Sequence, residues 1–254
     1  NMNDVMVSAA ALGIASVIGS LAGFIFRKIP HRLSDIFLGF CAGMMLGASV
    51  VCLILEGIEI AGASGWWQVA VGVAAGVALI SGIDRLAPHL HNLSGLGDVE
   101  SHPGISQTAS RVLLFVAAIA IHKFPEGIAT GITFDGHDID NAWAVTVSIA
   151  MQNIPEGLVV VTPLLLIGVS RMRTALVALS VAGIEIAGVF TGYYIGGLSA
   201  DLLPAMLGLA GGAMLYVLSD EMIPETHSHG YQRQATYALV AGVMTLLIIR
   251  QLTV

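Results

Sequence analysis

Apolar residues occur in long blocks along this chain, separated by short polar stretches. A membrane helix needs about 20 mostly apolar residues, and eight blocks meet this requirement. They are Val5–Phe26, Ser34–Leu55, Trp67–Ile83, Val112–Phe134, Ala142–Gly168, Thr174–Leu198, Leu202–Leu218 and Ala235–Leu252. The pattern predicts an all-α integral membrane protein with eight transmembrane helices, which are called spans one to eight in this subsection.

The composition supports a membrane protein and excludes two other classes. Of the 254 residues, 56% are hydrophobic and 11% are charged, whereas soluble domains are about 25% charged. The net charge of −7, with only 10 Lys and Arg residues, argues against nucleic-acid binding, which needs a basic surface. We therefore expect a single transmembrane domain over residues 1–254, with the lipid bilayer as its surroundings and no nucleic-acid partner.

The basic residues predict the orientation, because cytoplasmic loops of membrane proteins are rich in Lys and Arg. Loops that follow odd-numbered spans contain Arg27, Lys28, Arg32, Arg85, Arg111, Arg171, Arg173 and Arg233, whereas the other loops have none. Arg250, near the C-terminal end, is the exception. We expect the odd-numbered loops, including the long polar loop 84–111 between spans three and four, to be cytoplasmic. Both termini then lie outside the cell membrane.

Several polar residues interrupt the apolar spans. Burying a charged side chain at the bilayer centre costs roughly 2.5–3.5 kcal/mol on insertion scales, and such residues usually mark ion or proton pathways. Spans four, five and six nevertheless contain His122, Lys123, Glu126, Gln152, Asn153, Glu156 and Glu185. We interpret these residues as one functional group.

Two of these spans carry a repeated motif, HKFPEG at residues 122–127 and QNIPEG at residues 152–157. In each motif a polar residue precedes the glutamate by four positions, so both side chains share one helix face. The proline kinks a helix by removing a backbone N–H. Because consecutive spans are antiparallel, we expect spans four and five to form an inverted Pro-kinked pair around a midplane site, as in secondary transporters.

The side chains of this group favour a divalent metal. Clustered carboxylates repel one another unless they are protonated or bridged by a cation. Imidazole and carboxylate ligands suit Zn²⁺ and similar first-row ions. The lack of thiolate ligands suits an ion that is released after binding, so the pattern predicts transport rather than structural storage.

Two other functions are alternatives to metal transport. An intramembrane metalloprotease needs an HExxH-like pair with a general base, and no such pair occurs. We therefore predict no enzymatic activity and no catalytic cofactor. A proton- or sodium-coupled carrier of an organic solute, with the carboxylates as proton relays, stays open at this point.

The paired motifs resemble the signatures of the ZIP (Zrt/Irt-like) divalent metal transporters, and GFCAGMMLGAS and DEMIPETHSHG resemble other segments of prokaryotic members. The resemblance implies a metal path formed by spans two, four, five and six, with zinc moving into the cytoplasm. By motif, it implies metal ligands at His122, Glu126, Gln152, Asn153, Glu156, Glu185 and Met44.

The chain departs from the family pattern at Lys123. Many relatives have Asn after the first-motif histidine and can hold two adjacent metals. An ammonium among Glu126, Glu156 and Glu185 competes with a second cation. We therefore predict one bound metal, with Lys123 in place of the second ion.

Charged residues at the span ends suggest peripheral roles. Glu56 and Glu59, with Asp135, His137, Asp138 and Asp140, are candidates for a negative entrance that concentrates cations. On the cytoplasmic side, candidates for a metal exit or sensing site are Asp84, His89, His91, His102, Asp220, Glu221, Glu225, His227 and His229. The alternative for both groups is a solvated rim.

These observations together predict a carrier for Zn²⁺ and also for Cd²⁺, Fe²⁺ or Mn²⁺. We expect alternating access of one helix group against another, assisted by Gly127, Gly131, Gly157 and Gly183. A homodimer is an alternative to a monomer that the sequence leaves open.

Overall fold

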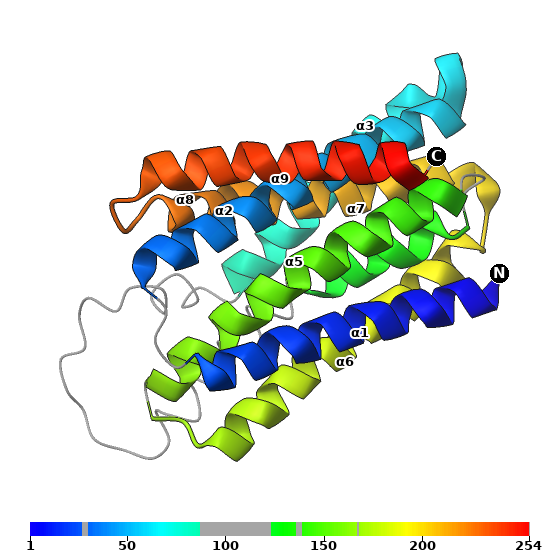
Figure 1. Cartoon of the computed structure of the whole chain (residues 1–254). Helices are drawn as coiled ribbons and strands as arrows, with labels where there is room; N and C mark the ends of the chain where they lie inside the picture. The colour runs from blue at the N-terminus through cyan, green and yellow to red at the C-terminus, as the bar shows by residue number, and fades with distance from the viewer. Residues whose placement is uncertain (27–29, 87–122, 136–138, 167, 254) are drawn as a thin grey trace.

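The structure is a computed structural model that describes residues 1–26, 30–86, 123–135, 139–166 and 168–253 (Figure 1). Within these ranges every regular element is helical. The elements are α1 (Met2–Ile25), α2 (His31–Gly47), the π-helix η1 (Ala48–Leu55), α3 (Glu56–Leu86), α5 (Ile139–Leu166), α6 (Arg171–Gly196), the 3₁₀ helix η2 (Ala200–Leu202), α7 (Leu203–Val217), the π-helix η3 (Leu218–Met222), α8 (Ile223–Thr226) and α9 (Gln232–Thr253). A further helix, unlabelled in Figure 1, covers residues 123–133.

Six helices in the described part of the chain are long and apolar enough to cross a membrane. This finding confirms the all-helical membrane class, although the number is lower than the eight spans expected. One of the six, His31–Ile83, is 53 residues long and contains the expected spans two and three. Only residues 123–134 of the expected span four are described.

The long run His31–Ile83 does not continue as one straight helix. Gly62, within α3, has φ 66° and ψ −173°, a backbone conformation that glycine adopts readily because it has no Cβ. The chain turns there, and the rest of α3 packs on α7. α3 then continues to Leu86, so residues 84–86 are helical, contrary to the expected loop boundary, and the rest of the 84–111 loop lies outside the described residues.

Glycine pairs bring the helices of the bundle into backbone contact. A Cβ on Gly76 of α3 would overlap the carbonyl oxygen of Leu209, and one on Gly212 of α7 would overlap that of Val73. The same relation joins α2 to α9 at Gly43 and joins α1 to α5 at Gly19. Small residues spaced four apart allow such close packing of membrane helices.

The glycines of the two repeated motifs take part in this packing. A Cβ on Gly127 would overlap the carbonyl oxygen of Glu185, and one on Gly131 would overlap that of Val189, so helix 123–133 lies directly against α6. Gly157 of α5 faces the backbone of α1 at Ser16–Ser20. Gly183 differs from these three glycines, because no described atom lies within 4 Å of the position of its Cβ.

These contacts divide the bundle into two groups of helices. The site group contains α1, α5, α6 and helix 123–133, and the support group contains α2, α3, α7 and α9. In Figure 1, α1 and α6 lie on one side of the bundle, α9, α2 and α7 lie on the other, and α5 runs between them. The two groups meet along α5, which contacts both α2 and α9.

Proline does not end either motif helix. Pro155 lies inside α5, which continues to Leu166, and Pro125 lies in the first described turn of helix 123–133. The inverted Pro-kinked pair stays a prediction.

Candidate metal site

Three helices of the site group bring the expected polar residues together. Lys123 and Glu126 lie three positions apart on helix 123–133, and Glu156 lies on α5. The exposed fraction is 5% for Lys123 and 1% for Glu126, and 0% for Glu185 on α6. These charged groups are therefore held inside the bundle, where each of them needs a partner.

Lys123 lies at the centre of the cluster. Its Nζ donates to Glu126 Oε2 at 2.7 Å, to Asn153 Oδ1 at 2.6 Å and to Glu156 Oε2. An ammonium group has three hydrogens to donate, and these three contacts use all of them. The ammonium thus occupies the space between Glu126 and Glu156.

Asn153 connects this ammonium to the third carboxylate. Its amide oxygen accepts from Lys123, and its Nδ2 donates to Glu185 Oε1 at 2.7 Å. The other oxygen of Glu185 accepts from Ser16 Oγ of α1 at 2.9 Å. Glu185 is therefore held by two neutral donors, Ser16 and Asn153.

Ser16 was not among the residues expected from the sequence. A serine in an apolar helix is a weak signal, because its hydroxyl can bond its own backbone. The spacing of Ser8, Ser16 and Ser20 is more informative, because all three are buried and lie along one face of α1. Such a face predicts contact with polar groups of neighbouring helices, although it does not identify Glu185.

Gln152 lies at the edge of the cluster that faces α2. Gln152 Nε2 donates to Glu126 Oε1 at 3.2 Å, and Gln152 Oε1 has no hydrogen-bond partner among the described residues. Cys41 of α2 contacts the backbone oxygen of Gln152 at 3.5 Å. This contact shows that α2 packs against α5 beside the site. Met44 follows Cys41 by three positions on α2 and is fully buried.

The cluster is not assembled as a coordination sphere. No group of three or more His, Cys, Asp or Glu side chains in the described ranges is placed to hold a metal ion, and His122 lies outside those ranges. One ammonium faces three carboxylates, and if all are ionised the cluster has an excess of two negative charges. This arrangement favours binding of a cation.

Glu56, a candidate for the acidic entrance, lies buried beside Arg250 rather than on an open surface. Glu56 Oε2 lies 3.9 Å from Nη2 of Arg250, and Nη1 of Arg250 donates to the backbone oxygen of Val51 in η1. Glu56 is 8% exposed, whereas Glu59 is exposed. The two side chains therefore do not form one open acidic pair, and Arg250, the exception in the loop pattern, is placed by these contacts. His137 and Asp138 lie outside the described residues.

The candidate exit residues fall into different environments. His227 Nδ1 lies within hydrogen-bond distance of Thr226 Oγ1 and Ile223 O, and its Nε2 lies 3.3 Å from Thr236 Oγ1. Asp220 is exposed and Glu221 is half-buried. His229 instead contacts Asp35, a buried residue of α2 that the sequence did not single out. Asp84 lies in α3, and His89, His91 and His102 lie outside the described residues.

Comparison with known proteins gives a consistent family. The sequence profile of the family described as ZIP Zinc transporter matches residues 87–250. The zinc transporter ZIPB of Bordetella bronchiseptica is 38% identical, over 97% of this chain and 82% of that protein. The zinc transporter GufA of Myxococcus xanthus is 35% identical over 96% of both chains. A zinc transporter ZupT of Corynebacterium glutamicum is 35% identical over 93% of this chain.

Proposed function

The chain belongs to the ZIP family of zinc transporters, and from this premise we propose that it carries Zn²⁺ through the site around Lys123. A transporter of this family is not an enzyme. The sequence left open a carrier of an organic solute, and the family favours the metal. Cd²⁺, Fe²⁺ and Mn²⁺ are the further ions that we propose as substrates.

The charge of the buried cluster is the observation that supports this proposal. Glu126 and Glu156 contact one ammonium, that of Lys123, and Asn153 joins this ammonium to Glu185. If all four groups are ionised, two negative charges remain. A divalent ion balances the remaining two negative charges. In a low-dielectric interior this balance matters, because an uncompensated buried charge costs several kcal/mol.

We propose that the ion binds where Lys123 now contacts Glu126 and Glu156, near the bilayer midplane. Binding there requires the ammonium to leave one or both carboxylates. The ligands of the proposed site are Met44, His122, Glu126, Gln152, Asn153, Glu156 and Glu185. The thioether of Met44 favours softer ions such as Cd²⁺.

Lys123 sets the proposed number of ions to one. Its ammonium reaches Glu126, Glu156 and Asn153 at once, so it supplies positive charge between the carboxylates that a second metal would bridge. We expect Lys123→Asn to remove this charge and to raise the zinc bound at the central site from one ion per chain to two. Equilibrium dialysis of the purified protein, with metal quantified by mass spectrometry, measures this number.

Lys123→Arg is the matched control, because it keeps the positive charge and is expected to bind no additional ion. The prediction is contradicted if Lys123→Asn binds the same number of zinc ions as the wild-type protein. It is equally contradicted if the wild-type protein holds two ions bridged by Glu126 and Glu156.

The proposed topology has eight spans in a single transmembrane domain. The break at Gly62 divides His31–Ile83 into two segments, and helix 123–133 is the described part of another. Both ends of the chain lie at the same end of the bundle (Figure 1), which agrees with an even number of crossings. The basic residues of the odd-numbered loops support termini outside the cell membrane and zinc movement into the cytoplasm.

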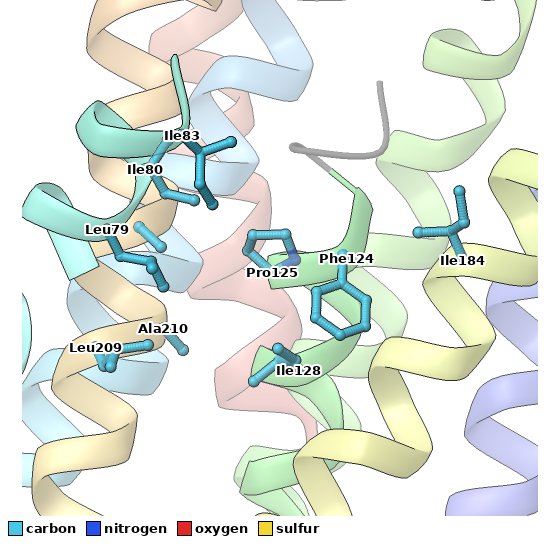
Figure 2. A pocket seen from close by; sticks show the side chains of 10 residues that line it. Leu79, Ile80, Ile83, Phe124, Pro125, Ile128, Ile184, Leu209 and Ala210 are labelled. Carbon is cyan, nitrogen blue, oxygen red and sulfur yellow. The ribbon is translucent and has the colours of Figure 1, made fainter. Parts of the chain in front are cut away.

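The two helix groups suit alternating access. Lys123 and the described ligands lie on the site group, except for Met44. Between the groups lies an apolar cavity of about 360 Å³ (Figure 2), lined by Leu79, Ile80, Ile83, Phe124, Pro125, Ile128, Ile184, Leu209, Ala210 and Ala213. Leu79 and Ala210 face Phe124 and Ile128 across it. No polar contact has to break along this part of the boundary when one group moves against the other.

Transport by the wild-type protein tests the proposed function directly. We expect proteoliposomes containing the full chain to accumulate Zn²⁺, and excess Cd²⁺ to reduce this accumulation more strongly than Mn²⁺, because of Met44. Zinc inside the vesicles is followed with a trapped fluorescent indicator. Protein-free liposomes are the control, and equal zinc accumulation in both preparations would refute the proposal.

A further inference from the structure

A second group of histidine and carboxylate side chains, which are common metal ligands, lies at the end of the bundle opposite the two termini. There the start of α2 meets the turn between α8 and α9 (Figure 1). His229 Nδ1 lies 2.9 Å from Asp35 Oδ1, and the Asp35 side chain is completely buried. Asp35 Oδ2 has no hydrogen-bond partner among the described residues. Among the described residues, the partner of this buried carboxylate is therefore the His229 imidazole.

This contact determines which nitrogen of His229 is available. An ionised carboxylate can accept hydrogen bonds but cannot donate them. We therefore assign the hydrogen of a neutral His229 ring to Nδ1, which leaves the lone pair on Nε2. Nε2 lies 3.4 Å from Ser228 Oγ and 3.9 Å from Glu225 Oε1. The Ser228 hydroxyl, which is also 3.0 Å from Nδ1, donates to the backbone oxygen of Glu225 at 2.8 Å. Among the described residues, Nε2 therefore has no strong hydrogen-bond donor.

The arrangement matches the way proteins prepare a histidine for a metal. Metal-binding histidines commonly donate their other ring N–H to a carboxylate, which fixes the ring orientation and raises its basicity. Asp35 is the carboxylate at Nδ1 of His229, and Glu225 lies on the Nε2 side of the ring. Ligand atoms about 2.0–2.2 Å from zinc in a tetrahedron are separated by roughly 3.4 Å. The separation of 3.9 Å is slightly wider, so a small rotation closes it.

His31 provides a third side chain. Its ring stacks on that of His229 with a centroid distance of 4.5 Å and an interplanar angle of 22°, and His31 is exposed. His229 is 29% exposed and Glu225 is 38% exposed, so all three are accessible from solvent. They are not preassembled as three ligands, and the stacked rings must separate before both can bind one ion.

We propose that Glu225, His229 and His31 form a second binding site for a divalent transition metal ion, with Asp35 as the residue that positions His229. This inference rests on the proposed function for the origin of the ion. In the proposed orientation this end faces the cytoplasm, so an ion leaving the central site meets it next. Asp35 and His31 lie on α2, which also carries Met44, so the second site and the central site share a helix.

The neighbouring histidine of the same turn has a different role. Both nitrogens of His227 lie near Thr226, Thr236 or the backbone oxygen of Ile223. They are occupied by the fold, and no carboxylate stands behind the ring in the described contacts. His227 is therefore the matched control for His229.

The test uses the full-length protein with the central site disabled by Glu126→Gln and Glu156→Gln, and Zn²⁺ as the probe. We expect His229→Ala to lower the zinc bound, measured by equilibrium dialysis, by one ion per chain, and His227→Ala to leave it unchanged. If the protein with both glutamate substitutions is not monodisperse, His229→Ala and His227→Ala are compared in the wild-type background. Equal binding by the parent protein and His229→Ala overturns the inference, as does an equal loss in His227→Ala.

The role of Asp35 is tested separately from folding. We expect Asp35→Ala to weaken zinc binding roughly 10- to 100-fold, and Asp35→Asn, which keeps a hydrogen-bond acceptor for Nδ1–H, to weaken it less. The visible absorption of bound Co²⁺ should keep its form in Asp35→Asn and change in Asp35→Ala. A lower thermal midpoint without metal, with unchanged zinc affinity in both variants, would show a structural role only and contradict the positioning role.

This experiment also separates the two proposals. Loss of zinc uptake by the wild-type protein would remove the proposed function even if binding that depends on His229 persists. Zinc uptake with binding unchanged by His229→Ala would keep the proposed function and remove the second site.

Discussion

We expect zinc accumulation in proteoliposomes to fall at least about 100-fold when Glu156 is replaced by alanine, and to a similar extent in His122→Ala. A factor of 100 corresponds to about 2.7 kcal/mol, a reasonable loss when a metal ligand is removed. In Glu156→Ala a second effect adds to the first. Lys123 donates to both Glu126 and Glu156, so without Glu156 the ammonium balances a larger share of the remaining negative charge.

The isosteric variant Glu156→Gln separates these effects from packing. It keeps the volume and an oxygen acceptor and removes only the charge, and we expect it to lose most of the transport as well. Asp201→Asn is the control, because Asp201 is an exposed carboxylate of η2 that belongs neither to the proposed ligands nor to the candidate entrance. Uptake is measured from initial rates at several zinc concentrations. Wild-type rates in both His122→Ala and Glu156→Ala would refute the assignment of the site.

The second large effect concerns the fold. We expect Gly131→Val to destabilise the protein by more than about 3 kcal/mol, at the upper end of the usual cost of overpacking. A Cβ at this position would overlap the backbone oxygen of Val189, and backbone cannot move aside as a flexible side chain can. Helix 123–133 would have to separate from α6, which would also separate Glu126 from Glu185.

Gly183→Val on α6 is the matched control, because nothing described lies within 4 Å of the Cβ position of Gly183. We expect its thermal midpoint to stay within a few degrees of the wild-type value. Thermal unfolding in detergent, followed by tryptophan fluorescence and size-exclusion chromatography, compares the two variants. Equal midpoints for Gly131→Val and Gly183→Val would show that the close approach of helix 123–133 and α6 does not contribute to stability.

The sequence alone was sufficient to predict the membrane class and four of the residues that meet at the centre, Lys123, Glu126, Asn153 and Glu156, but not Ser16. The repeat of HKFPEG and QNIPEG places Glu126 and Glu156 at equivalent positions of two helices, and the cost of burying them requires a partner. The structure brings both glutamates to Lys123. Their role as metal ligands stays a prediction, as does that of His122, which lies outside the described residues.

Other features depend on contacts between distant segments that no local pattern encodes. The contact between the buried Asp35 and the half-buried His229 joins residues 194 positions apart. In the sequence, Asp35 looks like an ordinary polar residue at the end of a span, next to the basic loop. Glu56 has the spacing of an exposed acidic pair with Glu59, yet Arg250 lies beside it. The π-helix η1 interrupts a stretch whose composition is typical of an ordinary membrane helix.

Gln152 Oε1, which has no hydrogen-bond partner among the described residues, has a consequence for the order of events when an ion arrives. The Lys123 ammonium uses all three of its hydrogens in hydrogen bonds. Both carboxylate oxygens of Glu126 and both of Glu185 also accept hydrogen bonds. An ion that had to displace one of these bonds before making any contact of its own would meet a kinetic barrier. Gln152 Oε1 is a buried acceptor with no described hydrogen bond that an ion would have to break. We therefore expect Gln152 to act early in capture, with its replacement slowing association more than it weakens the final complex.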